Sequence, residues 1–207
     1  MNRPIRSFVL RQGRTTPAQQ RALETLLPVY GIAFPEKIES RKPLVLEIGS
    51  GMGETTAEIA KANPEAEFVA VEVHGPGVGS LLNRIHGEKI RNLRVVRHDA
   101  VEVLERMVAD GSLAAVHLFF PDPWPKKRHH KRRLVQAPFV NLLKQKLKPG
   151  GVVHAATDWP DYALWIDEAF SGWGKASRGF AERPTTKFEA RGRKLGHAIR
   201  DLYFKNS

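Results

Sequence analysis

Short apolar runs alternate with segments of helical periodicity along most of the chain after residue 43. The apolar, β-branched runs are residues 44–48, 67–73, 93–99, 113–120 and 151–157. Apolar residues recur every three or four positions within residues 54–62, 77–90, 100–110 and 132–147. Runs of the first kind have the length of buried strands, and the second spacing is typical of amphipathic helices. The alternation predicts βαβ units and a parallel sheet covered by helices on both faces.

The two ends of the chain depart from this pattern. Lys148-Pro149-Gly150-Gly151 predicts a stop and a turn before the fifth strand. Beyond it, residues 161–170 have helical spacing, and we expect two short strands within residues 176–205, of which RDLYF (200–204) is the better candidate. Because residues 1–43 lack a comparable pattern, we expect a basic N-terminal arm over 1–43, packed on or hanging from one domain over 44–207.

The charge distribution indicates a polyanionic partner. The formal net charge of the 207 residues is +11, and residues 1–43, 119–133 and 178–207 each carry +5, which leaves −4 for the remainder. Three basic segments on a mildly acidic body are typical of a nucleic-acid binder. The absence of cysteine excludes disulfides, cysteine-based zinc sites and thiol nucleophiles. We expect no metal site, because His129 and His130 have no partners at metal-ligand spacing.

Targeting signals are weak. No apolar run approaches the roughly 18 residues of a membrane span, and no secretory h-region follows Met1, so a soluble, cytoplasmic protein is expected. Five Arg and no acid within the first 23 residues suggest a mitochondrial transit peptide as an alternative. Pro4, Gly13 and Pro17 would interrupt its amphipathic helix.

A glycine-rich loop follows the first strand-like run and directly precedes a helical segment. Gly49, Gly51 and Gly53 allow a ligand to approach main-chain N–H groups at the helix start. Their G-x-G-x-G spacing does not match the dinucleotide fingerprint, which disfavours an NAD enzyme. Glu54 at the helix start would repel a pyrophosphate, and no P-loop motif occurs, so ATP hydrolysis has no support.

Carboxylates close the first three strands beside this loop, at Glu47, Glu72 and Asp99. Ligands of open α/β sheets bind at the carboxyl ends of the strands, and an acid after the second strand can accept hydrogen bonds from both ribose hydroxyls. An acidic rim favours a nucleoside ligand without phosphates, ideally a cationic one. S-adenosylmethionine has this chemistry, since it carries ribose, adenine, an ammonium and a sulfonium.

Residues 119–133, FFPDPWPKKRHHKRR, place a lone carboxylate before the densest positive charge in the chain. The flanking prolines fix the backbone around Asp122, and Trp124 is a candidate to stack on or wall off a base. Methylation at C5 of a pyrimidine usually needs a cysteine adduct, whereas a ring nitrogen such as guanine N7 needs only alignment and charge stabilisation. We therefore expect Asp122 at a methyl-transfer site and the cations of residues 126–133 on a phosphate backbone.

Taken in order, the motifs IGSGMG, VEVH-GPGVG, HDA, FFPDPWPKKRHHKRR, TDWPDY and RPTTKFEARGRKLGH resemble the bacterial tRNA (guanine-N7)-methyltransferase family, which modifies the variable-loop guanine at position 46. The resemblance spans residues 44–205 and implies a class I methyltransferase: a doubly wound, mostly parallel seven-stranded sheet with helices on both faces. It further implies S-adenosylmethionine as cofactor and tRNA as partner. Ser50, where Phe is more usual, and Ala70, within a run where a glycine is expected, depart from the family pattern.

The resemblance also implies roles for particular residues. Those expected at the cofactor and active site are Glu47, Glu72, Asp99 and Asp122. Those expected to contact the substrate are Lys126, Asp158, Thr186, Lys187, Phe188 and Glu189. The cations of the basic run that we assign to the RNA backbone are Lys127, Arg128, Lys131, Arg132 and Arg133.

Two alternatives stay open at this point. One is a class I methyltransferase acting on another RNA nitrogen, such as an adenine amino group, although Asp122-Pro123-Trp124 lacks the second proline expected of such a loop. The other is an RNA-binding module with a vestigial cofactor site. The sequence leaves the choice between monomer and homodimer undecided.

Overall fold

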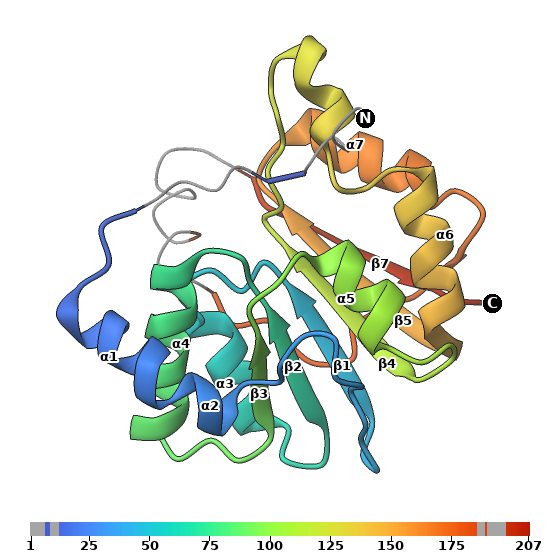
Figure 1. The fold of residues 1–207 in the computed structure, drawn as a ribbon. Helices are drawn as coiled ribbons and strands as arrows, with labels where there is room; N and C mark the ends of the chain where they lie inside the picture. Colours follow the sequence, from blue (N-terminus) through green and yellow to red (C-terminus); the bar gives the residue numbers. More distant parts are fainter. Residues whose placement is uncertain (1–6, 9–12, 186–188, 190–197) are drawn as a thin grey trace.

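A seven-stranded sheet forms the centre of the computed structural model, which describes residues 7–8, 13–185, 189 and 198–207 (Figure 1). Its strands are β1 (Leu44–Ile48), β2 (Glu67–Val71), β3 (Leu93–Val96), β4 (Leu113–Phe119), β5 (Leu147–Thr157), β6 (Gly174–Lys175) and β7 (Arg200–Lys205). They lie in the order β3-β2-β1-β4-β5-β7-β6. The first five pair in parallel, and β7 runs antiparallel to both β5 and β6. The predicted doubly wound, mostly parallel sheet is confirmed.

Helices cover both faces of this sheet. They are α1 (Pro17–Thr25), α2 (Leu27–Tyr30), α3 (Glu54–Ala62), α4 (Gly75–Gly87), α5 (Ala100–Met107), α6 (Ala137–Lys146) and α7 (Pro160–Ala169), with a 3-10 helix, η1, at Lys127–Arg132. Apolar residues of α5, α6 and α7 form one buried cluster with the sheet, and those of α1, α3 and α4 form a second. Every residue of β1 and β4 is buried, as expected of strands covered on both sides. The crossovers therefore leave one edge, at the carboxyl ends of the strands, for loops that carry function.

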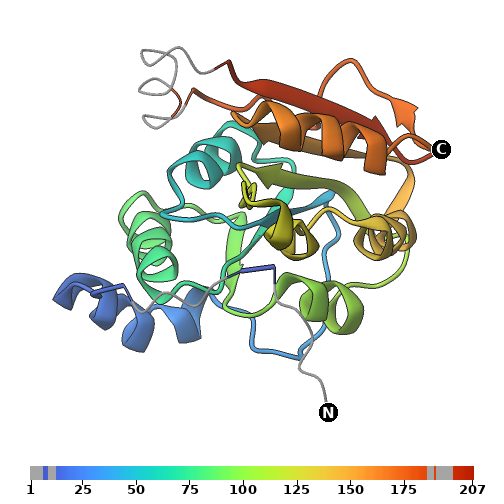
Figure 2. The same cartoon turned by 90° about the horizontal axis from the view of Figure 1, so that it is seen from above.

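The N-terminal region contains two helices that the apolar pattern did not predict. Helix α1 begins with a capping box, in which the Thr16 hydroxyl accepts from the Gln19 backbone N–H and the Gln19 side chain accepts from the Thr16 N–H. Both α1 and α2 pack on α4, and the two views agree in placing them beside it (Figures 1 and 2). A backbone bridge from Gly31 to Val95 continues the contact onto β3. From residue 13 to residue 43 the arm is thus packed on the sheet domain.

Several element boundaries differ from the sequence-based expectation, and the short strand that pairs with β7 lies before the expected range 176–205, as β6 at Gly174–Lys175. Strand β5 begins at Leu147 and passes through the predicted turn at Lys148–Gly151, with a register irregularity against β4 between Leu113 and Ala115. Helix α6 begins at Ala137, because η1 takes up the preceding residues of the basic run. Within the described ranges no helix is long and apolar enough to cross a membrane. No group of three His, Asp or Glu in those same ranges is arranged to hold a metal ion.

Candidate active site

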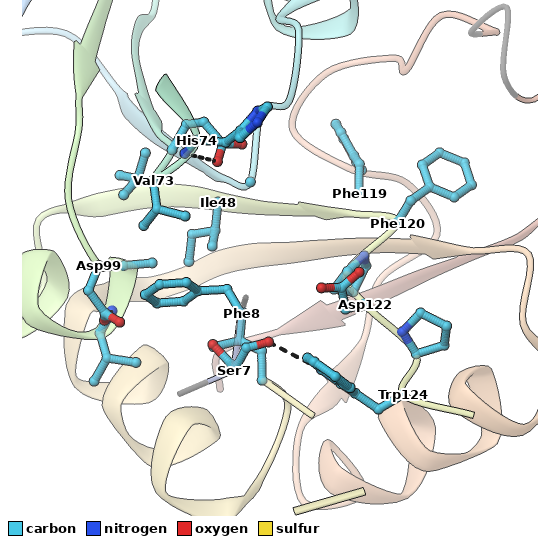
Figure 3. Close-up of a pocket in the computed structure, with 18 of the residues that line it drawn as sticks. Ser7, Phe8, Ile48, Val73, His74, Asp99, Phe119, Phe120, Asp122 and Trp124 are labelled. Carbon is cyan, nitrogen blue, oxygen red and sulfur yellow. Dashed lines mark hydrogen bonds between the residues drawn. The ribbon is translucent and has the colours of Figure 1, made fainter. Parts of the chain in front are cut away.

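A cavity of about 720 Å³ opens at the carboxyl ends of the strands (Figure 3). The last residues of β1, β2 and β4, namely Ile48, Val71 and Phe119, form part of its wall. The predicted site residues that line it are Gly49, Glu72, Asp99, Asp122 and Lys126. The structure therefore brings carboxylates from three separate loops into one cavity, where the sheet topology predicts a ligand.

The carboxylate of Glu72 is fixed by backbone donors on both sides. Its Oε2 accepts from the Gly51 N–H at 2.8 Å, and its Oε1 accepts from the His74 N–H at 2.8 Å. The residue is only 9% exposed. Each oxygen keeps a further lone pair, so this carboxylate can still accept two hydroxyl donors in a defined orientation. That is the geometry needed to recognise a ribose diol.

Two glycines, Gly53 in the glycine loop and Gly77 on α4, have no room for a side chain. Gly53 has φ +76°, and a Cβ built there would lie 2.5 Å from Cδ1 of Leu81 on α4. At Gly77, in the first turn of α4, a Cβ would lie 2.4 Å from the Gly51 carbonyl oxygen. The loop and the start of α4 can approach this closely only because both positions lack a side chain. The close approach lets Glu72 reach the Gly51 N–H.

Asp99 caps the next helix at the cavity rim. Its Oδ1 accepts from the Val101 N–H at 2.8 Å and the Glu102 N–H at 3.3 Å, so it is the N-cap residue of α5. This bond orients the carboxylate after β3. Its other oxygen, Oδ2, takes no part in the cap and lies on a residue that lines the cavity.

Asp122 lies on the opposite side of the cavity, in an irregular loop between β4 and η1. Two non-glycine residues with left-handed backbone bracket it, Phe120 with φ +51° and Trp124 with φ +46°. The indole N–H of Trp124 donates to the Ser7 carbonyl oxygen at 3.2 Å, and the Arg132 guanidinium lies 4.8 Å from the ring centroid. Trp124 is thus a wall of the cavity, with a cation over its ring and the arm on its indole edge.

Glu47, on β1, is not among the residues that line the cavity. It is 3% exposed, and its Oε1 accepts from the Thr56 hydroxyl at 2.7 Å. Its other oxygen is 3.9 Å from Nδ1 of the fully buried His117 on β4. In this arrangement Glu47 ties β1 to the first turn of α3 below the glycine loop.

The basic run divides into an outward and an inward part. Lys126, Lys127, Arg128 and Lys131 are exposed, as expected of phosphate contacts, and Arg132 is half-buried over Trp124. Arg133 is 1% exposed, so its assignment to the RNA backbone is wrong for this arrangement. The cause is local: its guanidinium turns inward, where it meets the carbonyl of Pro123 and the first turn of α7.

The predicted substrate contacts near the C-terminus are only partly described. Asp158 directly follows β5 at the carboxyl edge of the sheet, whereas Thr186, Lys187 and Phe188 lie outside the described residues. Glu189 is 1% exposed, and its carboxylate is ion-paired with Arg183. Sequence reasoning gave Arg183 no role.

Arg183 joins Glu189 to β7. Its Nε and Nη2 donate to the two oxygens of Asp201, each at 3.0 Å, and His154 lies 2.7 Å from the same carboxylate. Burial opposes the charged form of Asp201, but the hydrogen bonds from His154 and Arg183 hold its pKa well below the usual value. Burial lowers the pKa of His154, so we assign the neutral imidazole with its N–H on Nε2, facing Asp201.

Two residues of the arm also reach the cavity, and sequence reasoning assigned them no role there. Ser7 and Phe8 line it, and Figure 3 shows the Phe8 ring projecting between the Asp99 side and the Asp122 side. The available signal was a short apolar stretch, Phe8-Val9-Leu10, in an otherwise polar and basic segment. It was too short to predict an element by periodicity.

Comparison with known proteins places this chain in a family. Residues 41–202 match the family described as "Putative methyltransferase". Proteins called tRNA (guanine-N(7)-)-methyltransferase are similar over nearly the whole chain. The one from Neisseria meningitidis is 54% identical over 98% of this chain and 91% of its own, and the one from Chromobacterium violaceum is 54% identical over 98% and 96%.

Solved structures agree on the fold. Precorrin-6y C5,15-methyltransferase from Geobacter metallireducens matches with a TM-score of 0.58 and 13% identity over 100% of both chains. The 16S rRNA methyltransferase KamB matches with a TM-score of 0.55 and 16% identity over 94% of this chain and 95% of its own. At these identities the likeness concerns the class I methyltransferase fold alone. The sequence relatives, at 54% identity over nearly the whole chain, also show the family: the chain belongs to the bacterial tRNA (guanine-N7)-methyltransferase family.

Proposed function

We propose that this protein transfers a methyl group from S-adenosylmethionine to N7 of a guanine in tRNA, at position 46 of the variable loop. The observation that carries the proposal is the single cavity in which Glu72, Asp99 and Asp122 meet at the carboxyl edge of the sheet. Relatives that are 54% identical bear the name of this reaction, which supports guanine N7 of tRNA as the acceptor. The position within tRNA rests on the sequence resemblance.

The residues of the cavity suit the proposed methyl donor. Glu72 would accept the ribose hydroxyls, Asp99 would accept from the adenine amino group, and Gly49 would leave the main chain open to the ligand. The lining carries three carboxylates and one lysine, which favours a ligand with net positive charge. When bound, S-adenosylmethionine supplies an electrophilic methyl group on a sulfonium.

Asp122 would serve the acceptor base. Methylation at N7 leaves the guanine cationic, and a carboxylate fixed at the cavity wall stabilises that charge as it develops. The methylation of guanine N7 needs no general base, because the N7 lone pair is free in the plane of the ring. Lys126 at the rim and the exposed Lys127, Arg128 and Lys131 would hold the phosphates on either side of the target nucleotide.

The decisive experiment is incubation with unmodified tRNA and methyl-labelled S-adenosylmethionine, followed by nucleoside analysis and mapping of the labelled base. We expect label in 7-methylguanosine at position 46. Label in another base would refute the acceptor, and tight tRNA binding without label would favour an RNA-binding module whose cofactor site is vestigial.

A substitution then tests the role of Asp122. Asp122→Ala should lower kcat at saturating tRNA by roughly 10²–10³-fold and leave the tRNA Kd nearly unchanged. Asp167→Ala is the matched control, since Asp167 is a half-exposed carboxylate on α7 that pairs with Lys175. Weakened tRNA binding with normal turnover in Asp122→Ala would overturn the assignment.

A further inference from the structure

Arg133 is the one cation of the basic run, residues 126–133, that the fold buries. The other five cations of this fully described run are exposed or half-buried. The side chain of Arg133 has 0% exposure, and its carboxylate partner, Asp161, keeps 63%. Removing a guanidinium from water costs several kcal/mol unless its surroundings compensate. Such a position is poorly suited to a phosphate contact, which needs the cation at the surface.

The surroundings of Arg133 come from two different elements. Its Nε donates to the carbonyl oxygen of Pro123 at 2.9 Å, and its Nη2 is ion-paired with Asp161 in the first turn of α7. Its guanidinium carbon lies 4.9 Å from the ring centroids of both Tyr162 and Trp165, within the range of a cation–π contact. The side chain therefore connects the loop after β4 to α7.

The carbonyl that Arg133 holds belongs to the residue directly after Asp122. The next residue, Trp124, has φ +46°, a region that costs about 1–3 kcal/mol for a bulky side chain and persists only where neighbours over-determine it. The bond from Arg133 to Pro123 is one such constraint, on the peptide between Pro123 and Trp124. Burial raises the pKa of Tyr162 to about 12, and the charge of Asp122 adds to the increase.

We propose that Arg133 is a positioning residue for Asp122: it fixes the Pro123 carbonyl against α7 and thereby sets the place of the carboxylate in the cavity. This inference rests on the proposed function, because the rate that it predicts is the rate of the proposed methyl transfer. It assigns the two kinds of cation in the run separate roles, with the exposed ones holding RNA and the buried one holding the loop.

The test compares Arg133→Lys with Lys146→Met. Lysine keeps the charge but lacks the planar fork that bonds Pro123 and Asp161 together. Lys146, the last residue of α6, is a matched control. Its side chain is also buried, at 9% exposure, and pairs at 2.6 Å with the exposed carboxylate of Asp110. Single-turnover rates at saturating tRNA are normalised to the fraction of protein that binds tRNA. A smaller amount of folded protein is then not mistaken for a slower reaction.

We expect Arg133→Lys to lower the single-turnover rate at least tenfold while the tRNA KM and the salt slope of log K stay unchanged. Lys146→Met should keep the wild-type rate. A salt slope that falls by about 0.7–0.9 at a normal rate would show that Arg133 binds a phosphate, and would overturn the proposal. A normal rate with a normal slope would overturn it equally.

Hydrogen exchange supplies a measurement independent of the reaction. The backbone N–H of Phe120, at the start of the loop, donates to the Ala156 carbonyl oxygen at 2.7 Å. It should exchange at least tenfold faster in Arg133→Lys than in the wild type, and at the wild-type rate in Lys146→Met. Unchanged exchange in Arg133→Lys would refute the positioning role whatever the enzyme methylates. Absence of methylation by the wild type would instead refute the proposed function, and the two failures are thereby distinguished.

Discussion

Replacing Arg183 with methionine should destabilise the protein strongly near neutral pH. The change removes the cation that pairs with Glu189, at 1% side-chain exposure, and with Asp201, at 30%. Breaking a buried ion pair from one side costs about 3–5 kcal/mol, because the remaining charges lose their compensation. A chain of this length loses about 2–4 °C of Tm per kcal/mol, so the expected decrease is roughly 6–20 °C.

The pH dependence of this loss has a defined sign. In the wild type, the pKa of Asp201 is held below its usual value, so its contribution to folding is present above about pH 4 and is lost as the pH falls below that. In Arg183→Met, Glu189 and Asp201 lose their shared cation, so protonation of these carboxylates as the pH falls from 7 towards 4 relieves part of the penalty. The difference in unfolding free energy between the two proteins should therefore be largest at pH 7 and shrink towards pH 4.

Urea denaturation followed by circular dichroism at pH 7 and at pH 4 measures both quantities. Lys61→Met is the control, since Lys61 also pairs with two carboxylates, Glu58 and Glu88, but at 38% exposure, and should lose less than about 1 kcal/mol. A loss of that small size in Arg183→Met, or an equal loss at both pH values, would refute the reasoning from buried charge.

Two further predictions concern the cofactor side of the cavity, and both can be read by calorimetric titration with S-adenosylhomocysteine. Gly53→Ala should weaken cofactor binding and cost about 1–3 kcal/mol of stability, because φ is +76° and a Cβ would lie 2.5 Å from Leu81 Cδ1. An unchanged isotherm and an unchanged Tm would contradict the close approach of the loop and α4. Phe8→Ala should raise the cofactor Kd about tenfold, equivalent to about 1.4 kcal/mol, because it removes an apolar side chain from the cavity wall. The same Kd in variant and wild type would mean that the arm does not contribute to cofactor binding.

The elements that the sequence predicted best are those whose ends are marked by glycine-rich turns. Residues 44–48 and 54–62 were predicted with the bounds that β1 and α3 have, because a glycine loop separates two apolar patterns of different period. Helix α1 was missed since it buries only Ala22, which gives too little apolar periodicity to detect. Its capping box at Thr16 and Gln19 was nevertheless readable.

The site was predictable as a set of loops but not as a set of contacts. The rule that ligands bind at the carboxyl ends of strands was enough to bring Glu72, Asp99 and Asp122 together. No pattern within the basic run distinguishes Arg133 from its neighbours, because the cage that draws it inward comes from Tyr162 and Trp165 on a later helix. A local sequence pattern does not report which of several adjacent cations will meet such a partner.

The loop that carries Asp122 is constrained from two sides by buried arginines. On one side Arg133 bonds the Pro123 carbonyl, and on the other the Arg183 guanidinium lies 5.4 Å from the ring centroid of Phe120. Left-handed backbone at both Phe120 and Trp124 costs about 1–3 kcal/mol each, which the contacts around the loop must offset. These contacts lie within the protein, so the loop has this conformation without RNA. The backbone that carries Asp122 is therefore held in place before any ligand binds, and under the proposed function tRNA would need only to deliver the base to it.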